Sequence, residues 1–169
     1  MRKGWLSDAN WQFIQSTIPV PCVDVLFTKK VGSKISAIGL IYRDTPHEGT
    51  GWCLIGGRLL LNESFKAAIG RQLRETLGTK ARCILPSTLE PLLVTEYFSL
   101  QRRRALFDPR KHAVSVVFSA QLRGAIKPRG EAFDFRWFDP NQLPSSNAFG
   151  FGQKKVVAEC LRRLRETKR

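Results

Sequence analysis

The sequence predicts an α/β fold in which helices cover a mixed β-sheet. Its 169 residues are enough for one domain and too few for two ordinary ones. Apolar residues make up 43% of the chain, as is usual in globular proteins. Strand-like runs occur before, between and after helix-like segments. We therefore expect one domain over residues 1–169, with a core at about 18–145 and a helix at each end packed on it.

The N-terminal third predicts one short helix and three strands. Ser7 or Asp8 can cap a helix that runs to Ile14. Three runs rich in apolar residues then predict strands: Val20–Thr28, Ile35–Tyr42 and Trp52–Ile55. We expect Gly56 and Gly57 to end the third strand, because glycine pairs mark turns.

The middle of the chain predicts one amphipathic helix of about four turns. Asn62 or Ser64 can cap it, and Gly78 follows its last residue, Leu77. Its apolar residues recur every four positions and predict the buried face: Phe65, Ile69, Leu73 and Leu77. The remaining elements are strands near Leu92–Phe98, Ala113–Leu122 and Phe133–Phe138, and a last amphipathic helix over Val156–Leu164.

Composition narrows the classes of partner. Lys and Arg number 28 against 14 Asp and Glu, a net charge of +14 that favours polyanions such as nucleotides, nucleic acids and anionic membranes. The 4 cysteines are scattered without a CxxC pair, so we expect free thiols and no zinc site. No run approaches the roughly 20 apolar residues of a membrane span. No export signal is evident, so we expect a cytoplasmic protein without a membrane partner.

Polar residues beside the predicted core indicate a site. Arg71 and Glu75 form an i,i+4 pair at the border of the buried helix face. Gly56 and Gly57 allow a ligand to approach the backbone closely, as a phosphate or metal platform requires. Asp24 lies inside an apolar strand, where an unpaired charge is costly, so a binding role with an arginine partner is favoured over a core carboxylate.

The spacing of five residues resembles the box of the Nudix hydrolase family: Gly57, Glu63, Arg71, Glu75 and Gly78. Gln72 and Thr76 stand where that box has carboxylates that hold magnesium and activate water. Other segments, over most of the chain, resemble one group of that family, the GDP-mannose mannosyl hydrolases: Val23–Val25, Tyr42–Arg43, Gly56–Arg58 and Phe135–Trp137.

The resemblance implies a Nudix-type α/β/α sandwich, a homodimer, and hydrolysis of a nucleoside diphosphate sugar, GDP-mannose or similar, to sugar plus nucleoside diphosphate. It implies Mg²⁺ as cofactor, with Mn²⁺ as the alternative ion. Arginines and the ion would neutralise the leaving diphosphate in place of a general acid.

The resemblance also assigns the site residues. Arg43 and Arg58 would hold the diphosphate, and Asp24 and Arg71 would contact the sugar. The expected metal ligands are the carbonyl of Gly56 and the carboxylates of Glu75 and Glu131. We expect Glu131 to activate water, because the relatives' catalytic histidine and tyrosine positions correspond to Ala132 and Ala113. His47 and His112 are expected on the surface without a chemical role.

Two alternatives stay open from the sequence. One is a Nudix pyrophosphohydrolase that acts on another nucleoside diphosphate derivative. The other is an inactive module that binds nucleotides or nucleic acid, suggested by the loss of carboxylates at Gln72 and Thr76. For the basic loop Gln101–Lys111 and the basic last helix, a solvated surface is favoured over a nucleic-acid interface, since aromatic residues are sparse there.

Overall fold

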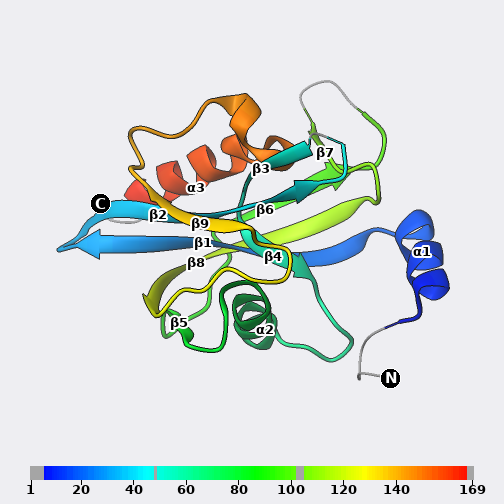
Figure 1. Cartoon of the computed structure of the whole chain (residues 1–169), viewed down its shortest axis with the longest axis horizontal. Helices are drawn as coiled ribbons and strands as arrows, with labels where there is room; N and C mark the ends of the chain where they lie inside the picture. Colours follow the sequence, from blue (N-terminus) through cyan, green and yellow to red (C-terminus); the bar gives the residue numbers. More distant parts are fainter. Residues whose placement is uncertain (1–5, 48, 102–104, 167–169) are drawn as a thin grey trace.

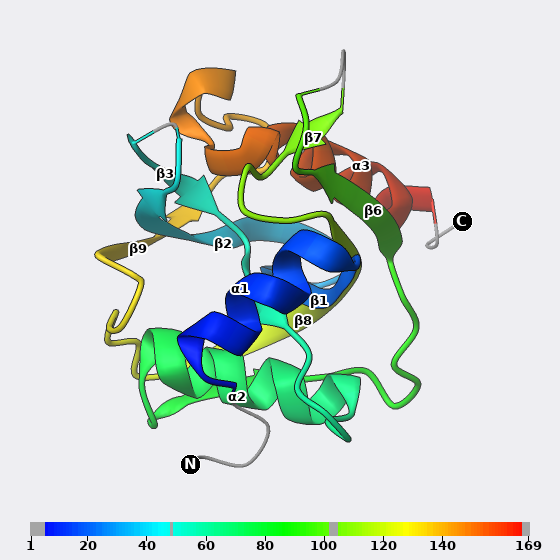
Figure 2. The same cartoon turned by 90° about the vertical axis from the view of Figure 1, so that its right-hand side faces the viewer.

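The computed structural model describes residues 6–47, 49–101 and 105–166. A curled mixed β-sheet lies between helix α2 (Phe65–Leu77) and helix α3 (Lys154–Glu166), as Figure 1 shows. Helix α1 (Asp8–Thr17) lies beside the start of the first strand (Figure 2). This arrangement confirms the expected α/β fold class, a mixed sheet with helices on its two faces.

The central path of the sheet runs in the order β3-β2-β1-β8-β6-β7. Its strands are β1 (Val20–Val31), β2 (Lys34–Thr45), β3 (Gly49–Cys53), β6 (Leu93–Phe98), β7 (Leu106–Phe107) and β8 (Ala113–Gly124). Three further strands pair outside this path: β4 (Ile55–Arg58) with β1, β5 (Ala81–Ile84) with β8, and β9 (Asp134–Phe138) with β2. Only two pairs are parallel within the described residues, β1 with β8 and β6 with β7.

Strand β1 changes its antiparallel partner halfway along its length. Its first half, Cys22–Val25, pairs with β4, and its second half pairs with β2 from Phe27 onward. Its other edge pairs with β8 from Val20 opposite Ala113 to Thr28 opposite Gln121. The sheet therefore opens between β4 and β2 near the middle of β1.

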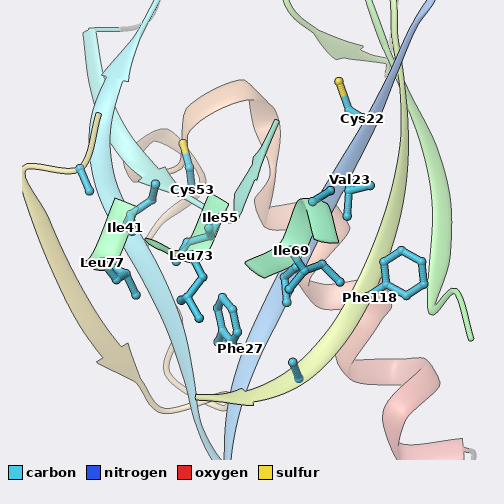
Figure 3. Packing of buried hydrophobic residues seen from close by; sticks show 14 of the residues in the cluster. Cys22, Val23, Phe27, Ile41, Cys53, Ile55, Ile69, Leu73, Leu77 and Phe118 are labelled. Atoms are coloured by element: carbon cyan, nitrogen blue, oxygen red, sulfur yellow. The ribbon is translucent and has the colours of Figure 1, made fainter. Parts of the chain in front are cut away.

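Both faces of the sheet are buried. Alternate β1 residues such as Val23 and Phe27 join Ile69, Leu73 and Leu77 of α2 in one cluster (Figure 3). The intervening Leu26 packs instead with Val157 and other residues of α3 in a second cluster. This two-sided burial explains why β1 reads as a nearly continuous apolar run.

Helix α2 begins and ends where its sequence predicts. The Ser64 side chain accepts a hydrogen bond from the Ala67 amide at 3.2 Å, which caps the first turn. Gly78 ends the helix with φ 88°, a conformation that favours glycine. Phe65 differs from expectation: it is 38% exposed, although its ring meets Phe118 at 5.3 Å.

One sequence-based expectation about strands is wrong, and two short strands have no counterpart in the sequence analysis. Gly56 and Gly57 lie inside β4 instead of ending a strand, and a Cβ on Gly56 would overlap the Asp24 carboxylate. Strands β5 and β7, which have only 4 and 2 residues, are not predicted. Segments this short carry too little alternation to stand out. Among the described residues, no helix has the length and apolar character needed to cross a membrane.

Candidate active site

Arg71 fastens the turn after β4 to helix α2. Its Nε and Nη2 atoms donate to the two carboxylate oxygens of Glu63 at 2.7 and 2.9 Å. Its Nη1 donates to Glu75 at 3.1 Å, and Nη2 also donates to the Arg58 carbonyl at 3.0 Å. Hydrogen bonding from Arg71 lowers the pKa of Glu63. The Arg71 guanidinium, which is predicted to contact a sugar, thus donates hydrogen bonds to three groups of the protein itself.

Gln72 is a buried amide that reaches the twin-glycine strand. Its Nε2 atom donates to the Gly57 carbonyl at 2.9 Å. Its Oε1 atom is buried and has no hydrogen-bond partner among the described residues. Thr76, one turn further along the helix, is also buried. Both positions that carry carboxylates in the Nudix box therefore hold neutral buried side chains here.

A cavity of about 70 Å³ lies where β1 leaves β4. Its polar and charged lining residues are Asp24, Arg43, Tyr97, Asp108, Arg110, Lys111, Ser115 and Gln153. The backbone of Gly56 and Gly57 forms another part of the wall. These residues come from five strands or their flanking loops and from the start of α3, so only the folded chain brings them together.

Asp24 is the buried carboxylate of this cavity. Ser115, on the neighbouring strand β8, donates a hydrogen bond from Oγ to Asp24 Oδ2 at 2.6 Å. Burial raises the pKa of Asp24 to about 6, against an ordinary value of 3.8, and the Ser115 hydrogen bond partly opposes this shift. Asp24 therefore changes its charge close to neutral pH.

Three cations of the site have carboxylate partners. Arg43 contacts Glu131 at 2.6 Å. Arg110 and Lys111 contact Asp108 at 2.9 and 3.1 Å. Burial acts to raise the pKa of Asp108, but these two cations outweigh it and lower the pKa to about 2. Burial raises the pKa of Glu131 in spite of Arg43. A ligand anion would compete with these carboxylates for the cations.

Three residues of the cavity carry no sequence signal. Gln153 accepts a hydrogen bond from the Leu54 amide at 2.7 Å and donates one to the Tyr97 hydroxyl at 3.0 Å. Phe151 has a φ of 56° and lies 5.9 Å from the Arg43 guanidinium and 5.5 Å from that of Arg110. Tyr97 is buried and pairs with Ala113 in the β6–β8 register, a neighbour that only the fold brings to it.

Other predicted residues lie apart from the cavity. The Arg58 guanidinium stacks on Trp11 of α1, 3.9 Å from the ring centre, and does not line the cavity. Burial and the nearby Arg71 lower the pKa of Arg58. His112 lies 3.3 Å from Glu96, and His47 packs against Phe107 with ring centres 4.6 Å apart.

Two of the three predicted magnesium ligands are paired with arginines in this arrangement. Glu75 and Glu131 each give an oxygen to a guanidinium. Gly56, whose carbonyl is the third expected ligand, lies in the wall of the cavity, and the carbonyl of its neighbour Gly57 accepts a hydrogen bond from the Gln72 amide. Within residues 6–47, 49–101 and 105–166, no group of three or more His, Cys, Asp or Glu side chains is placed to hold a metal ion.

Comparison with solved structures identifies the fold. A protein from Jonesia denitrificans, described as a possible asymmetric diadenosine tetraphosphate hydrolase, has a TM-score of 0.79 and 25% identity over 88% of this chain and 96% of its own. A MutT Nudix hydrolase from Burkholderia pseudomallei has a TM-score of 0.62 and 19% identity over 84% of this chain and 98% of its own.

The same fold occurs in a Nudix domain solved with a bound nucleotide derivative. The domain of Shewanella oneidensis NrtR, crystallised with ADP-ribose, has a TM-score of 0.63 and 18% identity over 94% of this chain and 99% of its own. The Nudix fold expected from the sequence is thereby confirmed, while none of these three proteins is described as a GDP-mannose hydrolase.

Sequence comparison gives the family. No curated protein is significantly similar to this chain. One family model, described as a domain of unknown function (DUF4916), matches residues 1–163. The chain, a Nudix fold with a neutral Gln72 and Thr76 in its box and a charged cavity around Asp24, belongs to the DUF4916 family.

Proposed function

We propose that this chain hydrolyses a nucleoside diphosphate derivative bound over the cavity around Asp24. The observation that carries the proposal is the buried Asp24 carboxylate beside Arg43 and Lys111. The cations suit a diphosphate, because guanidinium groups bind phosphate oxygens in pairs. A cavity of about 70 Å³ can admit one phosphate or a water, so the rest of the ligand lies outside it.

Asp24 is suited to activate water. Its pKa of about 6 makes it a proton acceptor near neutral pH, and Ser115 fixes one carboxylate oxygen. In the reaction, water attacks the electrophilic atom of the substrate, its proton passes to Asp24, and the nucleoside phosphate leaves with the bonding electron pair. Arg43 and Arg110 neutralise the charge that develops on the leaving group. Glu131, the base expected from the sequence, is held by Arg43 and serves to orient it.

The resemblance to GDP-mannose mannosyl hydrolases makes nucleotide sugars the first substrates to test. Attack at the sugar carbon gives free sugar and nucleoside diphosphate, whereas attack at phosphorus gives sugar phosphate and nucleoside monophosphate. Incubation with a panel of GDP-, UDP- and ADP-sugars, diadenosine tetraphosphate and ADP-ribose, followed by ³¹P NMR, separates the two. The reaction is run with and without Mg²⁺. The homodimer stays a prediction that analytical ultracentrifugation can test.

A second candidate function is binding without turnover. It is favoured by Gln72, which stands at a position that carries a carboxylate in the Nudix box. Its neutral amide donates a hydrogen bond to the Gly57 carbonyl. In this case nucleoside diphosphates bind through Arg43, and no product forms from any member of the panel. If this cavity is the site, Arg43→Ala should weaken nucleotide binding, and Asp24→Asn should abolish any turnover while binding is kept. Retention of binding by Arg43→Ala and of turnover by Asp24→Asn would show that the site lies elsewhere.

A further inference from the structure

Six exposed cations lie together away from the candidate active site. They come from the last turn of α2, from β5 and the turn before it, from the end of β8, and from the loop after β8: Arg74, Lys80, Arg82, Arg123, Lys127 and Arg129. We call these residues the basic surface. In Figure 1 this region is the end of the sheet where β5 lies beside α2. None of the six lines the cavity around Asp24.

The surroundings of Gly78 and Gly124 show which of these residues are neighbours. A Cβ on Gly78 would meet Lys127 on one side and Arg129 on the other, at 3.8 and 4.0 Å from their side-chain atoms. A Cβ on Gly124 would overlap the Lys80 carbonyl, which places Lys80 beside the end of β8. In the β5–β8 pair, Arg82 lies directly opposite Arg123. Five of the six positions thus adjoin one another, and Arg74 is joined to them through its carbonyl, which accepts a hydrogen bond from the Gly78 amide at 3.2 Å.

No carboxylate neutralises this region. The segments that supply five of the six cations, residues 76–89 and 109–130, contain no Asp or Glu. Glu75, which adjoins Arg74 in sequence, is bound by Arg71 at 3.1 Å. Across the described residues, no ion pair joins any of the six to a carboxylate.

Stability does not account for so much positive charge. Cations do favour a helix C-terminus, but the Thr76 and Leu77 carbonyls already accept backbone hydrogen bonds from Arg129 and Lys127, each at 2.9 Å. A charge on β5 can protect that edge of the sheet. Arg123, however, lies directly opposite Arg82 in the β5–β8 pair, and like charges in that position are destabilising. The repulsion would be relieved by a bound polyanion.

We propose that the basic surface binds the phosphate backbone of a nucleic acid without preference for base sequence. Lysine and arginine are sufficient for phosphate contacts, which carry no sequence information. Residues 76–89 and 121–130, which supply five of the six cations, contain no aromatic residue on which bases could stack. A membrane surface fits less well, because interfacial binding also requires apolar side chains that insert among the lipids.

The test is fluorescence anisotropy with a labelled 20-nucleotide RNA and a 20-base-pair DNA duplex, each of scrambled sequence. If about six phosphates are contacted, duplex affinity should fall by about 1,000-fold between 50 and 200 mM salt. The variant Arg82→Glu/Arg123→Glu removes two contacts and should lower the affinity at least tenfold and flatten the salt slope by about 2. Both residues are exposed, and circular dichroism checks that the variant folds.

A charge-matched control separates a specific surface from general basicity. Lys154→Glu/Lys155→Glu makes the same change in net charge in the first turn of α3, which packs on the opposite face of the sheet from α2. The proposal requires this control to lose clearly less affinity than Arg82→Glu/Arg123→Glu. Equal losses, no binding by the unaltered protein at 50 mM salt, or tighter binding to phosphatidylserine vesicles than to nucleic acid would each overturn it. Arg43→Ala should leave nucleic-acid binding unchanged. A failure of the basic surface to bind nucleic acid can therefore be told apart from a failure of the cavity to bind or hydrolyse nucleotides.

Discussion

The Nε2 atom of Gln72 lies 2.9 Å from the carbonyl oxygen of Gly57, and this hydrogen bond links α2 to β4. A carboxylate at the same position would face that carbonyl as a second oxygen, and two facing oxygens favour a cation between them. The identity of residue 72 therefore decides whether this contact is a hydrogen bond or part of a metal site.

Introduction of the two box carboxylates should create a metal site. In Gln72→Glu/Thr76→Glu, two buried carboxylates would repel each other and lower the melting temperature in EDTA, and Mn²⁺ should restore it. Isothermal titration calorimetry should give stoichiometric Mn²⁺ binding to the variant only. The control Ala67→Glu/Arg74→Gln adds the same charge on the exposed side of α2 and should bind no ion. Stoichiometric Mn²⁺ binding by the unaltered protein would contradict the role given to Gln72.

Asp24 should make the protein less stable as the pH rises. Its folded pKa of about 6 is above the ordinary value of 3.8, so between these values the folded state keeps a proton that the unfolded state has lost. The stabilisation present below pH 4 is lost by pH 6, by roughly 3 kcal/mol. Urea denaturation at pH 4 and pH 7 should show a smaller decrease for Asp24→Asn. If the free energy of unfolding decreased equally in Asp24→Asn and in the unaltered protein, Asp24 would not be the source of the decrease.

Arg43 should matter for ligand binding more than Arg58. Arg43 lines the cavity, whereas Arg58 stacks on Trp11. Arg43→Ala should weaken binding of a nucleoside diphosphate, and slow any turnover, by about 100-fold. Arg58→Ala should change either by less than about fivefold, because it removes no cavity donor. Calorimetry with ADP and GDP measures the affinities of the two variants. Equal losses of affinity would show that Arg58 also binds the ligand.

Arg71 should be a structural residue. It bonds two carboxylates and one carbonyl with a side chain only 15% exposed. Arg71→Ala leaves Glu63 partly buried without its cation and should lower the free energy of unfolding by about 3 kcal/mol. Arg162→Ala, which breaks ion pairs of a 55% exposed side chain, should cost less than about 1 kcal/mol. Similar losses in guanidinium denaturation would show that the Arg71 network is no stronger than a surface one.

Local sequence patterns were sufficient for the long elements. The caps at Ser64 and Gly78 and the apolar stripe of Ile69, Leu73 and Leu77 depend on neighbours in the chain, and α2 has the predicted bounds within a few residues. The short strands β5 and β7 exist only because β8 and β6 lie beside them, which no local pattern records.

The candidate site was less accessible from sequence. Asp24 could be selected, because a charge in an apolar strand needs a partner, but the partner expected was an arginine and the hydrogen bond comes from Ser115. That contact depends on the parallel β1–β8 register, which joins residues 91 positions apart. For the same reason Gln153 and Phe151, from the segment that leads into α3, gave no sequence signal for their place in the cavity.

The Arg71 network has a consequence for how this scaffold can change over time. Three side chains, Glu63, Arg71 and Glu75, and the Arg58 carbonyl join the segment between β4 and α2 through direct hydrogen bonds. A hydrolase scaffold whose loop keeps its shape on its own can exchange residues at positions 72 and 76 and still fold. The fold of this segment then does not depend on the residues that carry the chemistry. Substitutions at these two positions can therefore change the reaction, or leave only ligand binding, while the fold is kept.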